Sequence, residues 1–360
     1  MTQPLVLGIW DGHDAGAAVV GPSGLLAAVS EERLSRIKKQ GGWPTSAIEA
    51  ALQVAGCAAQ DIDQVAVAGT TGRLPARLLD RRYAAMPPQG IDPFSAGSRA
   101  FAAFQNGLAQ IPLLRQVERQ GSTVVLKRRL LAQGLGHARV ELVDHHLAHA
   151  TAAAATLTAN EGLVVTMDGY GDGISAAFWR LRSGGLERLL SQGPEASAAL
   201  LYGALTRVLG FREGEEGKLT GLAGLGYEEA TLNGAPWFTT DSGRLVVRRR
   251  AAIRALREAL RGGADRAAVA RALQIPMEEA VATVVRHHLA ACGTRHLALA
   301  GGLFANVSLN GRLASLPVDE LAVFPAMGDQ GLCVGAALHL AGPAVVCQPL
   351  PTMAMGPDLG

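Results

Sequence analysis

The chain has 360 residues, 49% hydrophobic and 18% charged, a composition that excludes a disordered chain and leaves room for two packed lobes. Its formal net charge of +2 gives no reason to expect a nucleic-acid-binding surface. No apolar run approaches the ~18–20 residues that a membrane-spanning helix needs, and the N-terminus does not resemble a secretory signal. The four cysteines are scattered and form no CxxC pair. We therefore expect a cytoplasmic protein that associates neither with membranes nor with nucleic acid.

The first part of the chain predicts a mixed sheet with helical additions. Short apolar runs bounded by glycine-rich turns predict five strands. These strands are expected at residues 5–9, 17–20, 25–29, 65–68 and 140–143. A helix is predicted over residues 45–55, between Pro44 and the stop signal Gly56, and another from Asp144 onward. Residues 73–136 are poor in strand signals, which predicts a helical insertion.

The opening pattern recurs in the second part of the chain. An apolar strand at 163–167 runs into an acidic glycine turn, and a second strand follows at 175–181. This repeat of strand, acidic glycine turn and strand predicts an α/β protein of two related lobes with helical insertions. The expected boundaries are residues 1–160 for the first lobe, 161–342 for the second and 343–360 for a Pro- and Gly-rich tail.

The remainder of the second lobe is expected to be mostly helical. Residues 195–291 predict a helical insertion, and the basic helix within it, 248–261, is more typical of a solvated face than of a partner site. A buried strand is predicted at 297–300 and a final helix at 332–340.

The strongest local signal is the histidine-rich run Asp144-His-His-Leu-Ala-His. On a helix, His145 and His149 are four residues apart and share one face, so both imidazoles can reach one metal ion. His146 points elsewhere, toward substrate or an outer partner. The alternative is that these histidines only make ordinary hydrogen bonds at the start of a helix. Three histidines in five residues favour the functional interpretation.

Two imidazoles do not complete a metal site, and carboxylates at strand ends are the natural additional ligands. Asp168 closes an apolar strand, and Asp329 follows the segment Phe324-Pro325. Each of them alone is as typical of a turn as of a ligand. A mixed nitrogen and oxygen set suits iron(II), manganese or zinc, and the residues do not choose between these ions.

Three glycine-rich turns follow apolar strands, at residues 11–16, 168–173 and 300–302. Glycine lets backbone N–H groups approach an anion, so each turn is a weak candidate for a phosphate cradle. Neither a GK[ST] segment nor a GxGxxG that opens a helix occurs. The three turns together favour a nucleotide held between two lobes.

Seven blocks that extend from Leu7 to Leu338 resemble, in order, the O-carbamoyltransferases of the NodU and tobramycin carbamoyltransferase type. They are LGIWDGHDAGAAVV, SEERLSRIKKQGGWP, VDHHLAHA, VTMDGYGDG, EEGKLTGLAGLGY, LAGGLFANVSLNGR and PAMGDQGLCVGAAL. The resemblance implies the actin-like ATPase (ASKHA) fold, in which two ribonuclease-H-like lobes enclose a nucleotide cleft. This implication agrees with the two related lobes inferred from the strands.

The resemblance also implies roles for individual residues. It places the metal ligands, with iron(II) as the usual ion, at His145, His149, Asp168 and Asp329. Catalytic roles are implied for His13, as a base for the acceptor hydroxyl, and for Lys38, as a stabiliser of charge on carbamoyl adenylate. A hydrogen-bonded turn residue is the alternative for His13. The positions implied to bind ATP or carbamoyl adenylate are Asp14, Gly169, Gly171, Glu216, Lys218, Gly221, Gly301, Gly302 and Asn306.

The implied activity is transfer of a carbamoyl group to the hydroxyl of a small-molecule acceptor. Full-length relatives continue into a YrdC-like domain that makes carbamoyl adenylate, and we expect a YrdC-like or longer carbamoyltransferase protein to supply it here. Thr220 also replaces the methionine usual in the KxMGLA block. Two other functions remain open: a tRNA threonylcarbamoyl-transfer subunit and a non-catalytic nucleotide-binding partner subunit. The low net charge does not favour the tRNA alternative.

Overall fold

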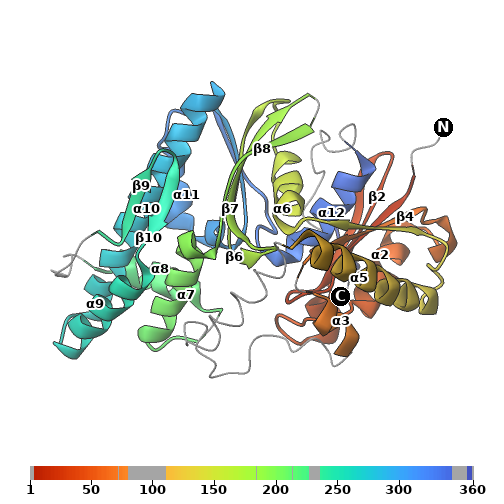
Figure 1. Ribbon diagram of the computed structural model, residues 1–360, viewed down its shortest axis with the longest axis horizontal. Helices are drawn as coiled ribbons and strands as arrows, with labels where there is room; N and C mark the ends of the chain where they lie inside the picture. The colour runs from red at the N-terminus through yellow and green to blue at the C-terminus, as the bar shows by residue number, and fades with distance from the viewer. Residues whose placement is uncertain are drawn as a thin grey trace.

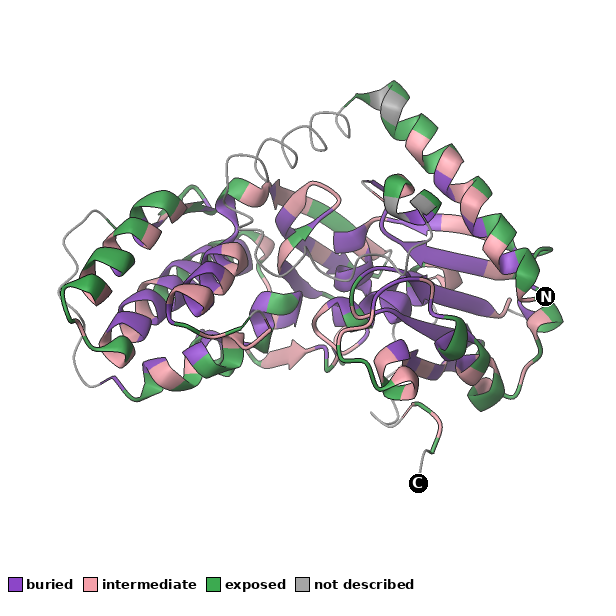
Figure 2. Ribbon diagram, turned by 90° about the horizontal axis from the view of Figure 1, so that it is seen from below, coloured by how far each residue is buried: buried purple, intermediate pink, exposed green. Residues whose placement is uncertain are grey.

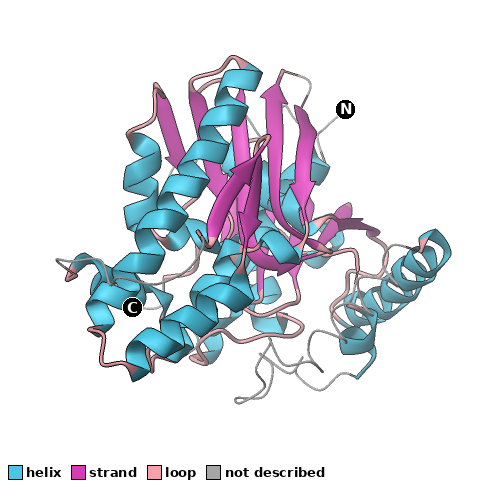
Figure 3. Ribbon diagram, turned by 60° about the vertical axis from the view of Figure 1, so that its left-hand side comes forward, coloured by secondary structure: helices cyan, strands magenta, loops and turns pink. Residues whose placement is uncertain are grey.

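A computed structural model shows an α/β protein built from two five-stranded sheets and a small hairpin (Figure 1). Helices lie on both sides of the strands (Figure 3). Buried residues gather in the strands and on the inward sides of the helices (Figure 2). The structure describes residues 4–71, 73–79, 111–183, 185–212, 214–226, 236–342 and 355–358. No helix within these ranges has the length and apolarity needed to cross a membrane.

The first sheet has the strand order β3-β2-β1-β4-β5. The central strand β1 pairs antiparallel with β2 and parallel with β4, while β3 and β5 form the edges. Every residue of β1 is buried, as expected for a strand covered on both faces. The strand bounds are Val6–Trp10 for β1, Gly16–Gly21 for β2, Gly24–Ser30 for β3, Gln64–Ala68 for β4 and Arg139–Val143 for β5.

The second sheet repeats this arrangement with the order β8-β7-β6-β11-β12. Its central strand β6 is again antiparallel to the next strand and parallel to the later one. The duplication confirms the predicted pair of related ribonuclease-H-like lobes. The bounds are Gly162–Gly171 for β6, Ile174–Arg182 for β7, Gly185–Gln192 for β8, His296–Ala300 for β11 and Glu320–Val323 for β12.

Two helices fill the space between the sheets, and each packs on the sheet of the other lobe. Helix α6 (His145–Ala154) follows β5 but contacts β6, β7 and β11. Helix α12 (Leu332–Ala341) follows β12 but contacts β1, β2 and β4. The two helices also pack on each other, and a side chain at Gly335 would overlap the carbonyl oxygen of Ala148. Because each of these helices packs on the sheet of the other lobe, the two lobes share one central hydrophobic core.

The remaining helices cover the outer faces of the two sheets. Apolar residues of α2 and α5 close the core outside the first sheet, and those of α7 and α10 close the core outside the second. The helix bounds are Glu31–Ser35 for α1, Thr45–Ala55 for α2, Leu74–Leu79 for α3, Pro112–Ala132 for α5, Ala198–Val208 for α7, Glu216–Gly224 for α8, Arg249–Arg261 for α9, Arg266–Cys292 for α10 and Val307–Ala314 for α11. Short 3₁₀ turns are Ala59–Asp61, Pro194–Ala196, Gly302–Ala305 and Asp329–Gly331, called η1 to η4.

The segment 195–291 is mostly helical, as expected, but one feature of it was not predicted. A hairpin of β9 (Phe238–Asp241) and β10 (Arg244–Val247) interrupts it. Ser242 and Gly243 form the turn with φ of 47° and 78°, the pair of positive φ values typical of a tight hairpin turn. In the other predicted insertion, 73–136, the structure has α3 and α5, and residues 80–110 lie outside the described part of the chain.

The segment predicted as a tail returns to the first sheet where the structure describes it. The carbonyl oxygen of Met355 accepts a hydrogen bond of 2.9 Å from the backbone N–H of Ala28 on the edge strand β3. Residues 343–354 and 359–360 lie outside the described residues. The short contact at 355–358 thus pairs part of an otherwise open sheet edge.

Candidate metal centre

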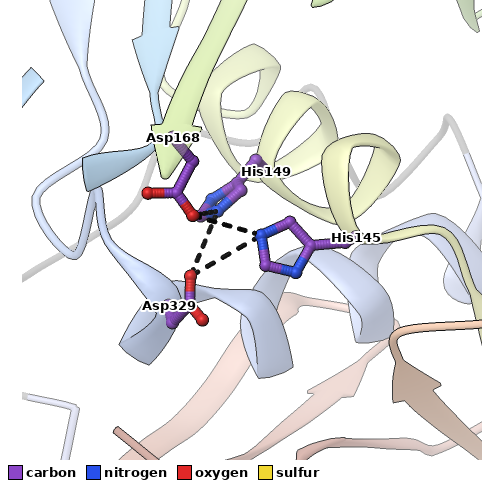
Figure 4. Close-up of side chains that lie close together, drawn as sticks. All are labelled: His145, His149, Asp168 and Asp329. Atoms are coloured by element: carbon purple, nitrogen blue, oxygen red, sulfur yellow. Dashed lines mark hydrogen bonds and ion pairs between the residues drawn. The ribbon is translucent and has the colours of Figure 1, made fainter. Parts of the chain in front are cut away.

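The two candidate histidine ligands lie on one face of α6, as the helical spacing predicts (Figure 4). The helix begins after Asp144, whose side chain accepts a hydrogen bond of 2.9 Å from the backbone N–H of Leu147 and so caps the first turn. His145 and His149 are both buried, and their rings meet edge to face with centroids 4.8 Å apart. Both rings point toward the loops at the ends of β6 and β12.

The two predicted carboxylates complete a cluster with these histidines. Asp168 stands near the end of β6, and Asp329 opens the 3₁₀ turn before α12. The Nε2 atom of His145 lies 3.3 Å from Asp168 Oδ2 and 3.6 Å from Asp329 Oδ1. The Nε2 atom of His149 lies 3.8 Å and 3.6 Å from the same two oxygens. One ligand atom from each residue falls within 4.8 Å of the others, and we call this set the four-residue cluster.

The charges of the four-residue cluster fit a cation at its centre. Burial alone would lower the pKa of His149, but Asp168 and Asp329 outweigh it and raise that pKa to about 9. Burial alone would raise the pKa of Asp168, but His145 and His149 hold it well below its usual range. The two buried carboxylates are therefore stabilised by a positive charge nearby, and a divalent metal bound by neutral imidazoles would supply that charge.

An orphaned nitrogen supports the same interpretation. Among the described residues, the buried Nε2 of His149 has no hydrogen-bond partner, although it points at two carboxylates. A buried polar atom without a partner costs free energy, so its persistence calls for a ligand. Two imidazole nitrogens and two carboxylate oxygens form a donor set that suits iron(II), manganese or zinc. The residues present therefore fit a divalent metal.

Glycines around the cluster make room for its ligands. The backbone N–H of Gly302 donates a hydrogen bond of 3.0 Å to Asp168 Oδ1, and a side chain at Gly302 would crowd that oxygen. Gly301 has a φ of 103°, and a Cβ there would overlap Met167. A side chain at Gly171 would overlap the ring of His145. Nucleotide binding by these glycines stays a prediction, and the role that the structure shows for them is to leave space for the candidate metal ligands.

Asp172 is a residue whose contribution sequence reasoning missed. It has a φ of 49°, and its carboxylate accepts hydrogen bonds of 2.9–3.2 Å from the backbone N–H and the hydroxyl of both Thr70 and Thr71. It also accepts one of 2.9 Å from the backbone N–H of His145. An acidic residue that bonds the N-terminus of α6 and the end of β4 ties the two lobes together beside the cluster. Its only sequence signal was its place as the second aspartate of the acidic glycine turn.

His13 reaches the cluster from the first lobe. Its Nδ1 lies 2.9 Å from Asp14 Oδ2 and its Nε2 lies 3.1 Å from Asp329 Oδ2, while its side chain is 53% exposed. The charge of Asp329 raises the pKa of His13 to about 9, with Asp14 contributing. With its pKa raised in this way, a protonated His13 can donate to both carboxylates. Asp14, with a φ of 56°, orients the ring.

The other predicted site residues are placed apart from the four-residue cluster. Lys38 is exposed in the turn after α1, and the side chain of the neighbouring Lys39 approaches Gly214 of the second lobe. On α8, Lys218 forms an ion pair of 2.7 Å with Glu215, and Glu216 accepts a hydrogen bond from Gly214.

Three more of the predicted positions belong to the second lobe. Gly221 faces open space on α8. Asn306 is buried, caps α11 and exchanges two side-chain hydrogen bonds of 3.0 Å with Gln274. Gly169 follows Asp168, and its carbonyl accepts a hydrogen bond of 3.0 Å from the hydroxyl of Ser197.

A buried ion pair next to the cluster was also missed. Asp11 is fully buried and lies 2.8 Å from Arg77 Nε and 3.1 Å from Arg73 Nη2. Burial alone would raise the pKa of Asp11, but the two guanidinium groups lower it well below its usual range. Trp10 links this pair to the cluster, since its ring lies under Arg73 and meets the ring of His145 with centroids 5.5 Å apart.

His146 does not face the cluster. Its Nδ1 lies 2.8 Å from the hydroxyl of Thr166, and its Nε2 lies 3.1 Å from the carbonyl oxygen of Ile174. Burial lowers the pKa of His146 well below its usual value, so the ring is neutral. Its function in this fold is to satisfy polar groups between α6 and the second sheet.

The fold resembles those of proteins with known structures. Full-length HypF in a phosphate- and nucleotide-bound form aligns with 94% of this chain and 46% of its own, at a TM-score of 0.56 and 13% identity. The activator of the 2-hydroxyisocaproyl-CoA dehydratase from Clostridium difficile, with bound ADPNP, aligns with 94% of both chains at a TM-score of 0.53 and 14% identity. At such identities the likeness establishes the fold, which is that of the actin-like ATPases.

Sequence comparison gives the family. The nodulation protein NolNO of Sinorhizobium fredii is 30% identical over 369 residues, which cover 97% of this chain and 49% of that protein. The nodulation protein NolO of Bradyrhizobium diazoefficiens is 31% identical over 234 residues, which cover 61% of this chain and 42% of NolO. The chain spans about half the length of the relatives it matches. The family described as "Carbamoyltransferase N-terminus" matches residues 5–338, and the chain belongs to this carbamoyltransferase family.

Proposed function

We propose that this chain transfers a carbamoyl group from carbamoyl adenylate to a hydroxyl of a small-molecule acceptor, with a divalent metal held by the four-residue cluster. The observation that carries the proposal is the buried convergence of two imidazoles on two carboxylates, with one imidazole nitrogen lacking a hydrogen-bond partner among the described residues. Membership of the carbamoyltransferase family supports the group that is transferred. Iron(II) is the proposed ion, and manganese or zinc is the alternative.

The proposed reaction is an acyl transfer. The acceptor's hydroxyl oxygen forms a bond to the carbamoyl carbon, the bond from that carbon to the adenylate phosphate oxygen breaks, and AMP leaves with the electron pair. The hydroxyl proton passes to a base. A divalent metal at this position would polarise the carbamoyl or phosphate oxygen. Backbone N–H groups of the glycine turns are suited to hold the phosphate, as the sequence predicts.

Three residues around the cluster have distinct tasks in this proposal. Asp168 is oriented by the N–H of Gly302, and Asp329 is oriented by His13. His13 is the expected base, but with a pKa raised to about 9 it holds a proton. It can accept the proton of the acceptor only when the negative charge of Asp329 is offset. Lys38 is exposed, so its predicted contact with carbamoyl adenylate stays a prediction.

The metal part of the proposal is tested by metal analysis. Wild-type protein loaded with iron(II), manganese or zinc should retain one ion per chain after gel filtration. The His149→Ala protein should bind the ion more than about 100-fold more weakly. This loss exceeds the loss typically seen when a residue that only hydrogen-bonds to a metal ligand is replaced. His287→Ala, which removes an exposed histidine of α10, is the matched control and should bind like wild type. Failure of wild type to retain any ion, or retention by His149→Ala, contradicts the proposal.

The transfer part is tested by product formation. The protein is incubated with carbamoyl phosphate, ATP and a panel of alcohols, alone and with a YrdC-like partner, and carbamate products are detected by mass spectrometry. The expected result is a carbamate that depends on the partner and is lost in the His149→Ala protein. Absence of carbamate in all pairings, from protein with bound metal, argues against the activity.

A further inference from the structure

A groove of 1220 Å³ lies beside the four-residue cluster, between the two lobes. One wall is the polar face of α5 from the first lobe, and the other is the end of β8 with the turn η2 from the second. The floor is the turn between β6 and β7, next to the start of α6. The groove is lined by Thr71, Arg115, Gln116, Arg119, Gln120, Asp144, Asp172, Gly173, Ile174, Arg188, Ser191, Gln192, Gly193, Pro194 and Glu195.

Several polar groups of the groove are already engaged with the protein. The carboxylate of Asp172 is filled by donors from Thr70, Thr71 and the start of α6. Asp144 caps α6, and the side-chain amide of Gln192 donates to and accepts from the backbone of Leu245. These groups shape the floor but have little capacity left to bind a ligand.

The three arginines of the groove, in contrast, have hydrogen-bond donors available for a ligand. Arg115 and Arg119 are four residues apart on α5, so their exposed side chains share one face. Arg188 faces them from β8, with its guanidinium 5.5 Å from the ring centroid of Trp179. Within the described part of the chain, none of the three forms an ion pair with a carboxylate within 4.0 Å, although the charge of Arg188 acts at longer range on Asp144 and works to lower its pKa. Guanidinium groups are donors only and match the oxygens of phosphate, sulfate or carboxylate.

The position of the groove connects it to the chemistry of the cluster. Asp172 on its floor accepts a hydrogen bond of 2.9 Å from the backbone N–H of His145. Gly171, the preceding residue, packs against the His145 ring. The groove floor and the four-residue cluster therefore share the start of α6 and the β6–β7 turn, and one hydrogen bond, from the His145 backbone to Asp172, connects the floor to a candidate metal ligand.

We propose that this groove binds the hydroxyl-bearing acceptor, and that the acceptor carries an anionic group held by Arg115, Arg119 and Arg188. The inference rests on the proposed carbamoyl transfer only in naming the bound molecule as the acceptor. Binding of an anionic polyol requires neither carbamoyl adenylate nor metal, so it can be measured separately from transfer.

The test uses four sugars that differ in one substituent: glucose, glucose 6-phosphate, glucose 6-sulfate and glucuronate. Each is titrated into the full chain by calorimetry at low ionic strength, where charge contacts are least screened. Saturating ATP is present so that phosphate groups cannot bind in the nucleotide cleft. At least one of the three anionic sugars should bind, and glucose should not. The anion that binds identifies the substituent of the acceptor.

Two variants and a control locate the binding. Arg119→Gln and Arg188→Gln should each weaken the anionic sugar about tenfold, because each removes charged hydrogen bonds. Arg257→Gln, on the exposed face of α9, should leave it unchanged. The proposal is overturned if no anionic sugar binds to wild type, if glucose binds as tightly, or if both groove variants bind like wild type. A failed transfer assay alongside groove-dependent anion binding would instead count against the proposed function.

Discussion

Replacing Asp172 by asparagine tests whether the link between the lobes also positions the metal centre. Asparagine keeps the shape of the side chain and tolerates the positive φ of 49° at this position, so the backbone is little strained. It replaces one carboxylate oxygen by an NH2 group, which then faces backbone N–H donors of Thr70, Thr71 or His145. The change therefore removes hydrogen bonds and sets donor against donor.

The structure gives the size of the expected effect. Hydrogen bonds to a charged group contribute about 1.5–3 kcal/mol each, and roughly half of those to Asp172 are lost. Because Asp172 is only half-buried, water recovers part of this, and we expect the free energy of unfolding to fall by about 2–4 kcal/mol. Whichever way the amide is turned, the backbone N–H of His145 no longer donates to a charged carboxylate, so metal affinity should fall about 10- to 100-fold, as for other residues that hydrogen-bond to metal ligands.

Urea unfolding of the metal-free protein measures the stability, and competition with a chelator measures the metal affinity. Asp241→Asn is the control, because that exposed carboxylate accepts only from the adjacent Ser242 among the bonds described and should change stability by no more than about 0.5 kcal/mol. A folded Asp172→Asn protein that binds metal as tightly as wild type would refute the positioning role. Equal unfolding free energies for Asp172→Asn and wild type would refute the lobe link.

Two further predictions concern the core next to the cluster. Arg77→Met removes the 2.8 Å contact of Arg77 with the buried Asp11, keeps the contact of Arg73, and should cost about 3 kcal/mol at neutral pH. Since the pKa of Asp11 is lowered in the folded protein, its pairing stabilises the fold above the unfolded carboxyl pKa of about 3.9, and this stabilisation is lost as the pH falls below it. Urea unfolding at a series of pH values should therefore show a steeper acid loss for wild type than for Arg77→Met, and equal slopes contradict the argument. Gly335→Ala should destabilise by about 1–3 kcal/mol because the methyl group overlaps Ala148, whereas Gly311→Ala, in open space on α11, should stabilise by about 0.5–1 kcal/mol. Thermal unfolding compares the two, and a shift of the same sign in both would exclude the close approach as the cause.

The sequence predicted the structure best where a local pattern of residues determines a helix or strand by itself. The helix over 45–55 and the central strand β1 follow from apolar runs and stop signals, and the structure has them with nearly the same bounds. The strand predicted at 163–167 is present but continues to Gly171, through the first part of the segment predicted as a turn. The spacing of His145 and His149 sufficed to place both on one face of a helix. The edge strands β8 and β12 were missed because their residues are largely half-buried and show no clear alternation. Burial, which produces the pattern, is weakest at the edge of a sheet.

The parts that could not be foreseen depend on contacts between distant segments. Asp11 meets Arg77 across 66 positions, and Asp172 meets Thr70 across 102. No local spacing connects such residues, and an aspartate next to glycine in a turn is equally typical of a bare loop. The same limit applies to Gly171 and Gly302. Their sequence context indicated room for phosphate, whereas the structure shows that the space also accommodates the ring of His145 and the carboxylate of Asp168.

The candidate metal centre is tied to the way the two lobes interlock. The histidines of α6 and the carboxylate of Asp168 are carried by elements on the second sheet, whereas Asp329 opens the turn into α12, which packs on the first. The four ligand atoms can therefore meet only while α6 and α12 are in contact. A metal held by all four ligands would stabilise this state by mass action. Gly335 is for this reason important to the cluster as well as to the core, because a side chain there would overlap the carbonyl oxygen of Ala148 and push the two helices apart.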